Sequence, residues 1–183
     1  SAVTAYDKAL TMAPNNPSII LARASLEFAN KKNDEAKKFI QQALDLKVNY
    51  TDAIFLLAQI ETSEGNIGEA IKQAERAATL TPNDATIFFR LGLLRYNNSD
   101  YSGAVGAFEQ AVILDNNYLN ARFFLGQAYQ KVGRGSDALV QYNILGKILP
   151  DNKDIKDAIN SVSNPQATPP VPTTPAATKA PAK

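Results

Sequence analysis

Apolar residues recur at helical spacing in short blocks along the chain, and a polar break separates each block from the next. Ile54, Leu57 and Ala58, for example, share one helical face, the polar run at 63–66 interrupts the pattern, and the apolar spacing then resumes. Apolar residues three and four positions apart line one side of an α-helix. The pattern therefore predicts paired helices, with first helices near 18–30, 52–64, 85–97 and 119–132 and second helices near 35–47, 67–80, 101–114 and 135–148.

The blocks repeat every 34 residues, and side-chain size recurs at fixed positions of the repeat. The eighth position of each unit holds a small residue in all four units: Ala24, Ala58, Gly92 and Gly126. A glycine inside a helix costs roughly 1 kcal/mol relative to alanine. We therefore expect a neighbouring helix to cross Gly92 and Gly126 too closely for a side chain. A hairpin of this length cannot bury its apolar face alone, so the units must stack on one another.

This register resembles the tetratricopeptide repeat. The resemblance rests on Leu-Gly or Leu-Ala at positions 7 and 8, alanine at positions 20 and 27, and proline at position 32, seen in Pro82 and Pro150. It covers residues 17–152 as four full repeats and implies an all-α, right-handed superhelical α-solenoid of antiparallel helix hairpins. Arg23 replaces the usual leucine at position 7, while Val48 and Asn116 replace proline. These departures are expected to soften individual repeats, the first one most.

The two ends extend the array. Residues 1–16 fit only the second half of the register, and residues 153–163 carry an apolar face opposite charges, as solenoid caps do. Residues 164–183 are rich in proline, alanine and threonine, a composition that does not form a core. The predicted organisation is the second helix of a truncated repeat at 1–16, repeats at 17–50, 51–84, 85–118 and 119–152, a capping helix at 153–163 and a disordered tail at 164–183.

Composition narrows the chemistry. The net charge is +1, from 19 basic and 18 acidic residues, which argues against a nucleic-acid partner. No apolar run approaches the roughly 20 residues of a membrane helix, so we expect no membrane insertion by this segment. The chain has no histidine and no cysteine, so the commonest general base and the thiolate metal ligands are missing. We therefore expect that the chain has no catalytic residues and is not an enzyme.

Two short motifs partly match known ligand-binding loops. The run "GRGSDA" at 133–138 superficially matches a dinucleotide-binding loop, but a predicted helix precedes it where that loop needs a strand. It is interpreted as the turn between two helices. Acidic runs such as "NNSD" at 97–100 lack the ligand spacing of a calcium loop and are interpreted as helix caps. No cofactor-binding or metal-binding residues are expected.

The remaining candidate is a stripe on the first helices. In tetratricopeptide proteins, first-helix positions 2, 5, 9, 12 and 13 line the concave surface, so the resemblance implies a groove for a protein or peptide. Aromatic residues at position 5 can equally serve contacts between repeats, and both alternatives stay open. The Lys and Asn that relatives use to grip a terminal carboxylate are absent at positions 5 and 9, which disfavours that ligand. The candidate partner-binding residues are Leu21, Phe28, Phe55, Gln59, Phe89, Leu93, Tyr96, Phe123 and Gln127.

These observations predict a non-enzymatic scaffold for protein–protein interaction. One alternative is an auxiliary or self-association domain of a larger membrane or secreted bacterial envelope protein, with self-association through residues 1–16. A more remote alternative is the accessory domain of an enzyme whose catalytic part lies outside this chain. The composition of the tail resembles that of bacterial cell-envelope proteins and favours a soluble domain of an envelope or membrane-anchored protein, with a cytoplasmic location left open.

Overall fold

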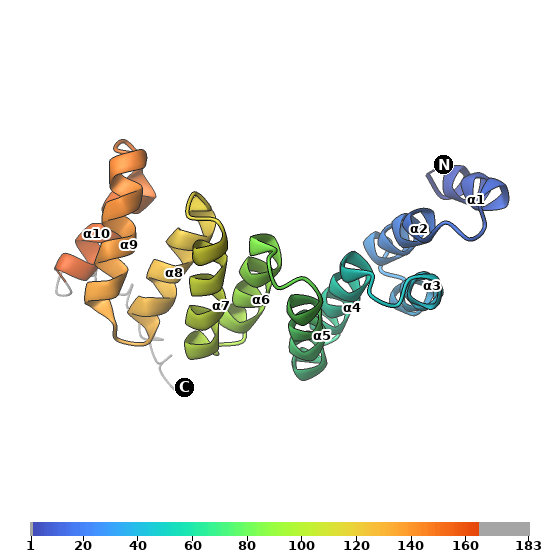
Figure 1. The fold of residues 1–183 in the computed structure, drawn as a ribbon, viewed down its shortest axis with the longest axis horizontal. Helices are drawn as coiled ribbons and strands as arrows, with labels where there is room; N and C mark the ends of the chain where they lie inside the picture. The colour runs from blue at the N-terminus through green and yellow to red at the C-terminus, as the bar shows by residue number, and fades with distance from the viewer. Residues whose placement is uncertain (1, 165–183) are drawn as a thin grey trace, which may run out of the picture.

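The computed structural model describes residues 2–164 as an elongated stack of α-helices, with α1 at one end and α10 at the other (Figure 1). No strand occurs between residues 2 and 164, and the helices fall where the apolar pattern predicts them. The predicted tail lies outside the described residues apart from Asn164. The helices are α1 (Ala2–Met12), α2 (Pro17–Ala29), α3 (Asn33–Leu46), α4 (Thr51–Ser63), α5 (Ile67–Leu80), α6 (Ala85–Asn97), α7 (Tyr101–Leu114), α8 (Leu119–Lys131), α9 (Gly135–Ile148) and α10 (Lys153–Ser163).

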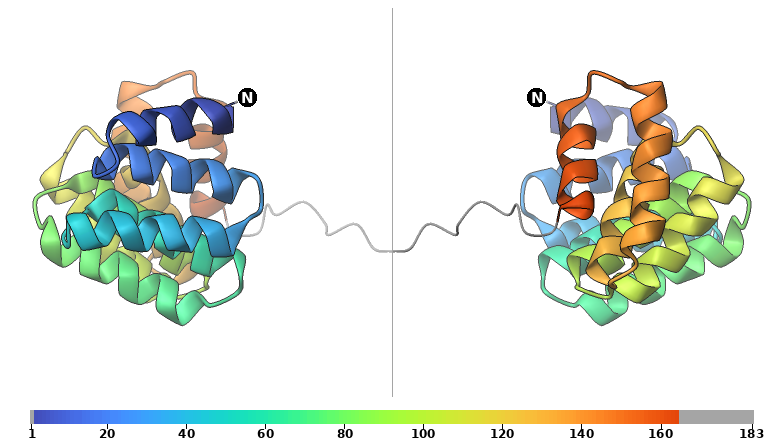
Figure 2. Two further views of the ribbon diagram at one scale, coloured as in Figure 1. Left: turned by 90° about the vertical axis from the view of Figure 1, so that its right-hand side faces the viewer. Right: turned by 90° about the vertical axis from the view of Figure 1, so that its left-hand side faces the viewer.

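Four antiparallel hairpins make up the array: α2–α3, α4–α5, α6–α7 and α8–α9. The second helix of each hairpin also contacts the first helix of the next, so that α3 packs on α4, α5 on α6 and α7 on α8. Views from the two ends show the successive hairpins turning about the long axis (Figure 2). The predicted α-solenoid is confirmed.

The turn of every hairpin has the same backbone conformation. The residue at position 15 of each repeat has a positive φ, and the amide after it donates back to a carbonyl five residues earlier, as Lys32 N does to Glu27 O at 2.9 Å. This is the Schellman arrangement that satisfies the last carbonyls of a helix. Glycine adopts positive φ without a Cβ penalty, whereas other residues pay for it. Two of the four turns use glycine and two do not: Gly65 (φ 82°), Gly133 (φ 78°), Lys31 (φ 61°) and Ser99 (φ 63°).

The small residues at position 8 mark close approaches, as predicted. A Cβ built on Gly92 would lie 2.5 Å from two ring carbons of Phe108, and one on Gly126 would lie 2.5 Å from a ring carbon of Tyr142. Phe108 and Tyr142 occupy position 24, in the second helix of the same repeat, and both are fully buried. In the first repeat the corresponding pair is Ala24 with Ile40 in one core cluster. The glycine and the aromatic ring are therefore complementary in size.

Arg23, the departure from leucine in the first repeat, is buried with partners. Its Nε lies 3.1 Å from Oδ1 of Asp7 on α1, and its guanidinium also bonds to Glu27 on its own helix. The guanidinium carbon lies 5.3 Å from the ring centroid of Phe39 on α3. Arg23 thus joins α1 to the first full repeat, a role that leucine would not perform.

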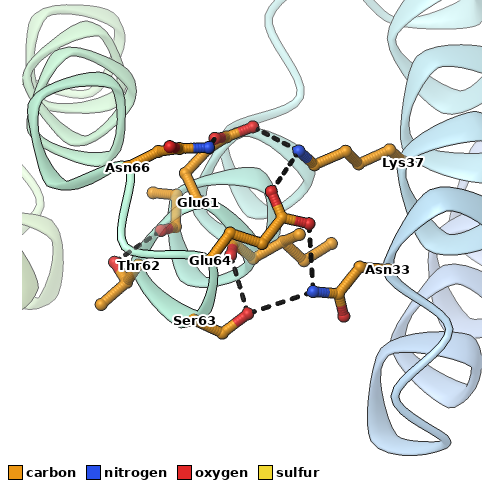
Figure 3. A network of polar contacts seen from close by, with 9 residues as sticks. Asn33, Lys37, Glu61, Thr62, Ser63, Glu64 and Asn66 are labelled. Atoms are coloured by element: carbon orange, nitrogen blue, oxygen red, sulfur yellow. Dashed lines mark hydrogen bonds and ion pairs between the residues drawn. The ribbon is translucent and has the colours of Figure 1, made fainter.

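A polar cluster joins the first two full repeats (Figure 3). Nζ of Lys37 on α3 lies 2.8 Å from Oε1 of Glu61 and 2.6 Å from Oε2 of Glu64, both on the α4 side. Asn33 Nδ2 donates to Glu64 Oε1 at 3.1 Å, and Asn66 Nδ2 donates to Glu61 Oε2 at 2.8 Å. The hydrogen bond with Glu61 is the largest cause that raises the pKa of Lys37, and the same bond lowers the pKa of Glu61. The cluster therefore stabilises the ionised forms of both groups.

Candidate partner-binding face

The predicted stripe comes from one layer of the solenoid, the first helices α2, α4, α6 and α8. Leu21 and Phe28 lie on α2, Phe55 and Gln59 on α4, and Phe123 and Gln127 on α8. The remaining three, Phe89, Leu93 and Tyr96, lie on α6. Gln59 is exposed, Phe55 is buried, and the other seven side chains are partly buried. Most of the stripe therefore presents only part of each side chain to solvent.

The aromatic rings at position 5 pack against other aromatic rings of the array, and the contact between Phe89 and Phe124 joins two repeats. The Phe89 ring centroid lies 4.9 Å from that of Tyr118 and 5.8 Å from that of Phe124. The Phe123 ring lies 5.8 Å from the ring of Tyr142. Offset and edge-on arrangements at these distances are the favourable ones for aromatic pairs. These rings serve the array's own stability, whatever else they contact.

Phe55, one of the candidate partner-binding residues, is buried, and only 5% of its surface is accessible. It belongs to a core cluster with Ala74 on α5 and Ile87 and Leu91 on α6. The guanidinium carbon of Arg90 lies 5.4 Å from its ring centroid. Phe55 therefore forms part of the floor of a surface feature and does not project from it.

That feature is a cleft of about 340 Å³ between α4 and α6. It brings together three residues of the predicted stripe, namely Phe55, Gln59 and Leu93. Its floor is apolar and its rim is polar, a combination that suits a side chain of a bound peptide. The other residues that line it are Ala58, Thr62, Arg90, Leu94 and Asn97.

Of the lining residues outside the predicted set, Thr62 and Asn97 occupy positions 12 and 13, which belong to the concave register. That register could have identified both. Arg90 and Leu94 occupy positions 6 and 10, outside the register, so no signal in the sequence points to them. Their contribution depends on how α6 is rotated and how far it stands from α4.

The cleft occurs where the backbones of neighbouring first helices lie further apart. The backbones of α2 and α4, and those of α6 and α8, approach more closely than those of α4 and α6, which meet through side chains such as Phe55, Ile87 and Leu91. A second hollow, of about 260 Å³, lies near the ends of α8, α9 and α10. It contains Phe123 of the predicted stripe. The residues lining this second hollow are Leu119, Asn120, Phe123, Leu145, Leu149, Asn152, Asp154 and Ile155.

The two motifs interpreted as turn and cap chemistry lie at helix ends. Gly133 is in the turn between α8 and α9, and Arg134 stacks 4.3 Å over Tyr129 and pairs with Asp137 at 2.6 Å. A helix, α8, precedes the motif where a dinucleotide-binding loop has a strand. Oδ1 of Asp100 caps α7 by accepting from Gly103 N at 2.9 Å. Within residues 2–164 no group of three or more His, Cys, Asp or Glu is placed to hold a metal ion.

Among the helices described between residues 2 and 164, none is long and apolar enough to cross a membrane.

The pKa values of Tyr129 and Tyr142 are raised for structural reasons. Burial, together with a hydrogen bond to Glu109, raises the pKa of Tyr129 to about 12. Burial also raises the pKa of Tyr142, whose hydroxyl donates to Gln130 Oε1 at 2.8 Å. Both groups stay neutral at physiological pH and strengthen contacts between helices.

Comparison with known proteins identifies the class. A family model described as tetratricopeptide repeat matches residues 21–85 and 89–152, well over half of the chain. The chain belongs to the tetratricopeptide repeat family. This family is generally a non-catalytic repeat for protein–protein interaction, so the array is an interaction scaffold by class. No curated protein sequence matches the chain significantly.

Solved structures with the same fold are tetratricopeptide proteins of low sequence identity. YrrB, described as a TPR protein with an unusual peptide-binding site, is 21% identical with a TM-score of 0.70, and the match covers 86% of this chain and 81% of YrrB. The C-terminal part of a TPR repeat-containing protein from Cytophaga hutchinsonii is 19% identical with a TM-score of 0.74, over 90% of this chain and 66% of that one. MamA is 22% identical with a TM-score of 0.66, over 78% of this chain and 83% of MamA. At such identity the likeness establishes the fold alone.

Proposed function

We propose that this array binds an extended peptide, or an extended segment of a partner protein, along the face formed by α2, α4, α6 and α8. The cleft between α4 and α6 is the principal contact. The observation that carries the proposal is the cleft itself, because it combines an apolar floor with a polar rim drawn from two successive repeats. The peptide-binding site described for the similar protein YrrB makes the same class of ligand reasonable here.

The apolar floor and the polar rim of the cleft would contact different parts of a bound peptide. Phe55 and Leu93 provide apolar surface that a ligand side chain would cover. The amides of Gln59 and Asn97 can donate to and accept from a peptide backbone, as an extended ligand requires. Since Phe55 is already packed among its own neighbours, it holds its position before a ligand arrives. A preformed floor lowers the ordering cost of binding.

The test uses Gln59→Arg and its matched control Gln110→Arg. Both glutamines are exposed, but Gln59 lines the cleft and Gln110 lies on α7, a second helix. Peptides selected from a displayed random library on the wild-type array are measured against both variants. We expect Gln59→Arg to weaken the selected peptides at least tenfold, about 1.4 kcal/mol, and Gln110→Arg to leave their affinity unchanged.

Both variants should unfold at the wild-type temperature, because each replaces an exposed side chain. Selected peptides that bind the two variants equally well would overturn the choice of cleft. A library that yields no specific binder at all would overturn the peptide as the class of ligand.

A further inference from the structure

Two hollows within residues 2–164 include residues of the first-helix register, and their charged lining residues differ in sign. The α4–α6 cleft carries Arg90, which is exposed, stacks over Phe55 and forms no ion pair with a carboxylate of the described residues. The hollow at α8 and α10 carries Asp154, also exposed and without a cationic partner in residues 2–164. Each hollow also has an aromatic ring from position 5, Phe55 in the first and Phe123 in the second.

We propose that the partner is an extended segment with two apolar anchors about seven residues apart, an acidic residue beside the anchor in the α4–α6 cleft and a basic residue beside the other. This inference rests on the proposed function and names the chemistry of its ligand. One anchor covers Leu93 and the accessible edge of the Phe55 ring, with its acidic neighbour at Arg90. The other covers Phe123 and Leu119, with its basic neighbour at Asp154.

The spacing follows from the helix arrangement. One hollow lies between α4 and α6 and the other between the ends of α8 and α10, so their centres are two helix spacings apart, roughly 20 Å at the upper end of the usual 8–10 Å between packed helices. The first hollow is centred about six residues further along its helices than the second, which adds an offset of about 9 Å along the helix axes. The straight distance is then about 22 Å. An extended chain advances about 3.1–3.4 Å per residue and spans this distance with about seven residues.

The surface between the two hollows is closed, which supports two anchors in place of one continuous contact. Helices α6 and α8 are in direct contact there. The rings of Tyr96 and Phe124 meet edge-on with centroids 6.2 Å apart, and those of Phe89 and Phe124 lie 5.8 Å apart. A ligand segment that crosses these rings passes over a filled surface, so its side chains are not enclosed.

The test uses a labelled synthetic peptide and its fluorescence anisotropy. The peptide has a leucine–glutamate pair at one end and a leucine–lysine pair at the other, with Gly/Ser residues between them chosen so that the two leucines lie about seven residues apart. It is made in both chain directions because the hollows do not set its polarity. Controls are the two half-peptides and a version in which the two leucines lie about three residues apart. A linked pair gains affinity through effective concentration. We expect the full peptide to bind at least tenfold more tightly than either half, and the short version to lose that gain.

Variants that change the charge of Arg90 or Asp154 identify which end of the peptide lies in each hollow. Arg90→Glu should weaken the full peptide about tenfold, and replacing the peptide's glutamate with lysine should restore it. Asp154→Asn should weaken binding of the full peptide through its lysine end only. The half-peptide that carries glutamate should therefore bind this variant as tightly as it binds the wild type. The matched control is Lys38→Glu, on the exposed face of α3, which should have no effect.

Half-peptides that bind as tightly as the full peptide would overturn the two-anchor arrangement, and so would an absence of binding by every peptide in the series. Neither result touches the proposed function, which depends on whether library-selected ligands respond to Gln59→Arg. If the selected ligands ignore Gln59→Arg while the designed peptide responds to Arg90→Glu, the proposed principal contact is wrong and the charge assignment remains.

Discussion

Replacing Gly92 with alanine would place a methyl carbon 2.5 Å from Cδ1 and Cε1 of Phe108. Phe108 is fully buried, and its ring lies 5.9 Å from the rings of both Phe89 and Phe124. An aromatic ring held on several sides cannot move aside as a flexible chain end would. The two helices must therefore separate, or the ring must leave its preferred position.

Two effects of opposite sign set the magnitude. Alanine in mid-helix is worth about 1 kcal/mol more than glycine. Overpacking a tight core costs typically about 1–3 kcal/mol and sometimes more. Because the contact at Gly92 is far inside normal carbon–carbon distances, the upper part of that range applies. We expect Gly92→Ala to lower the free energy of unfolding by about 1–2 kcal/mol.

The matched control is Gly106→Ala in α7. Gly106 is also inside a helix but is exposed, and no heavy atom would lie within 4 Å of its new Cβ. It should therefore gain helix propensity alone, about 1 kcal/mol. A chain of this size shifts by roughly 2–4 °C per kcal/mol, so thermal unfolding followed by far-UV circular dichroism should separate the two variants by about 5–10 °C.

The first repeat suggests a rescue. Since it combines Ala24 with Ile40, the double variant Gly92→Ala with Phe108→Ile should be more stable than the sum of its single effects predicts. A Gly92→Ala protein that melts at or above the wild-type temperature would refute the close approach as the reason for the glycine.

Four further predictions concern other parts of the array. Lys31→Gly should raise the free energy of unfolding by about 0.5–1 kcal/mol in denaturant titrations, because Lys31 has a φ of 61°; an unchanged midpoint would contradict this. Lys37→Met should lower the melting temperature at neutral pH. The pKa of Glu61 is lowered below 4.5 in the folded state, so its contribution is present above that pH and lost as the pH falls through the folded value; the wild-type and variant curves should converge in acid, and a constant difference would count against the ion pair. Deleting residues 164–183 should leave the melting temperature within about a degree, since a tail of this composition is expected to bury almost nothing, and a larger drop would mean that it docks. Light scattering should detect concentration-dependent self-association through α1, where Tyr6 is partly exposed, whereas a strict monomer at high concentration would oppose it.

Local and periodic features of this protein were determined by its sequence. The 34-residue register places α2 to α9 correctly because apolar spacing, turn residues and helix caps act over a few residues along the chain. The close helix packing at Gly92 and Gly126 could also be predicted from the sequence, because a costly glycine at a fixed period indicates a repeated contact. The same register identified Phe55, Gln59 and Leu93 as residues of one face.

Other features were decided by the tertiary structure. The distance between α4 and α6 depends on the combined sizes of side chains from several helices, so the cleft and its Arg90 could not be read from any one repeat. Phe55 became a buried floor because Ala74, Ile87 and Leu91 close around it, although its register position is the same as that of Phe89 and Phe123. Arg23 looked like a defect in the first repeat, and its partner Asp7 on α1 is what makes it a link between helices. In each case the outcome depends on contacts between residues distant in the chain, which a periodic pattern does not specify.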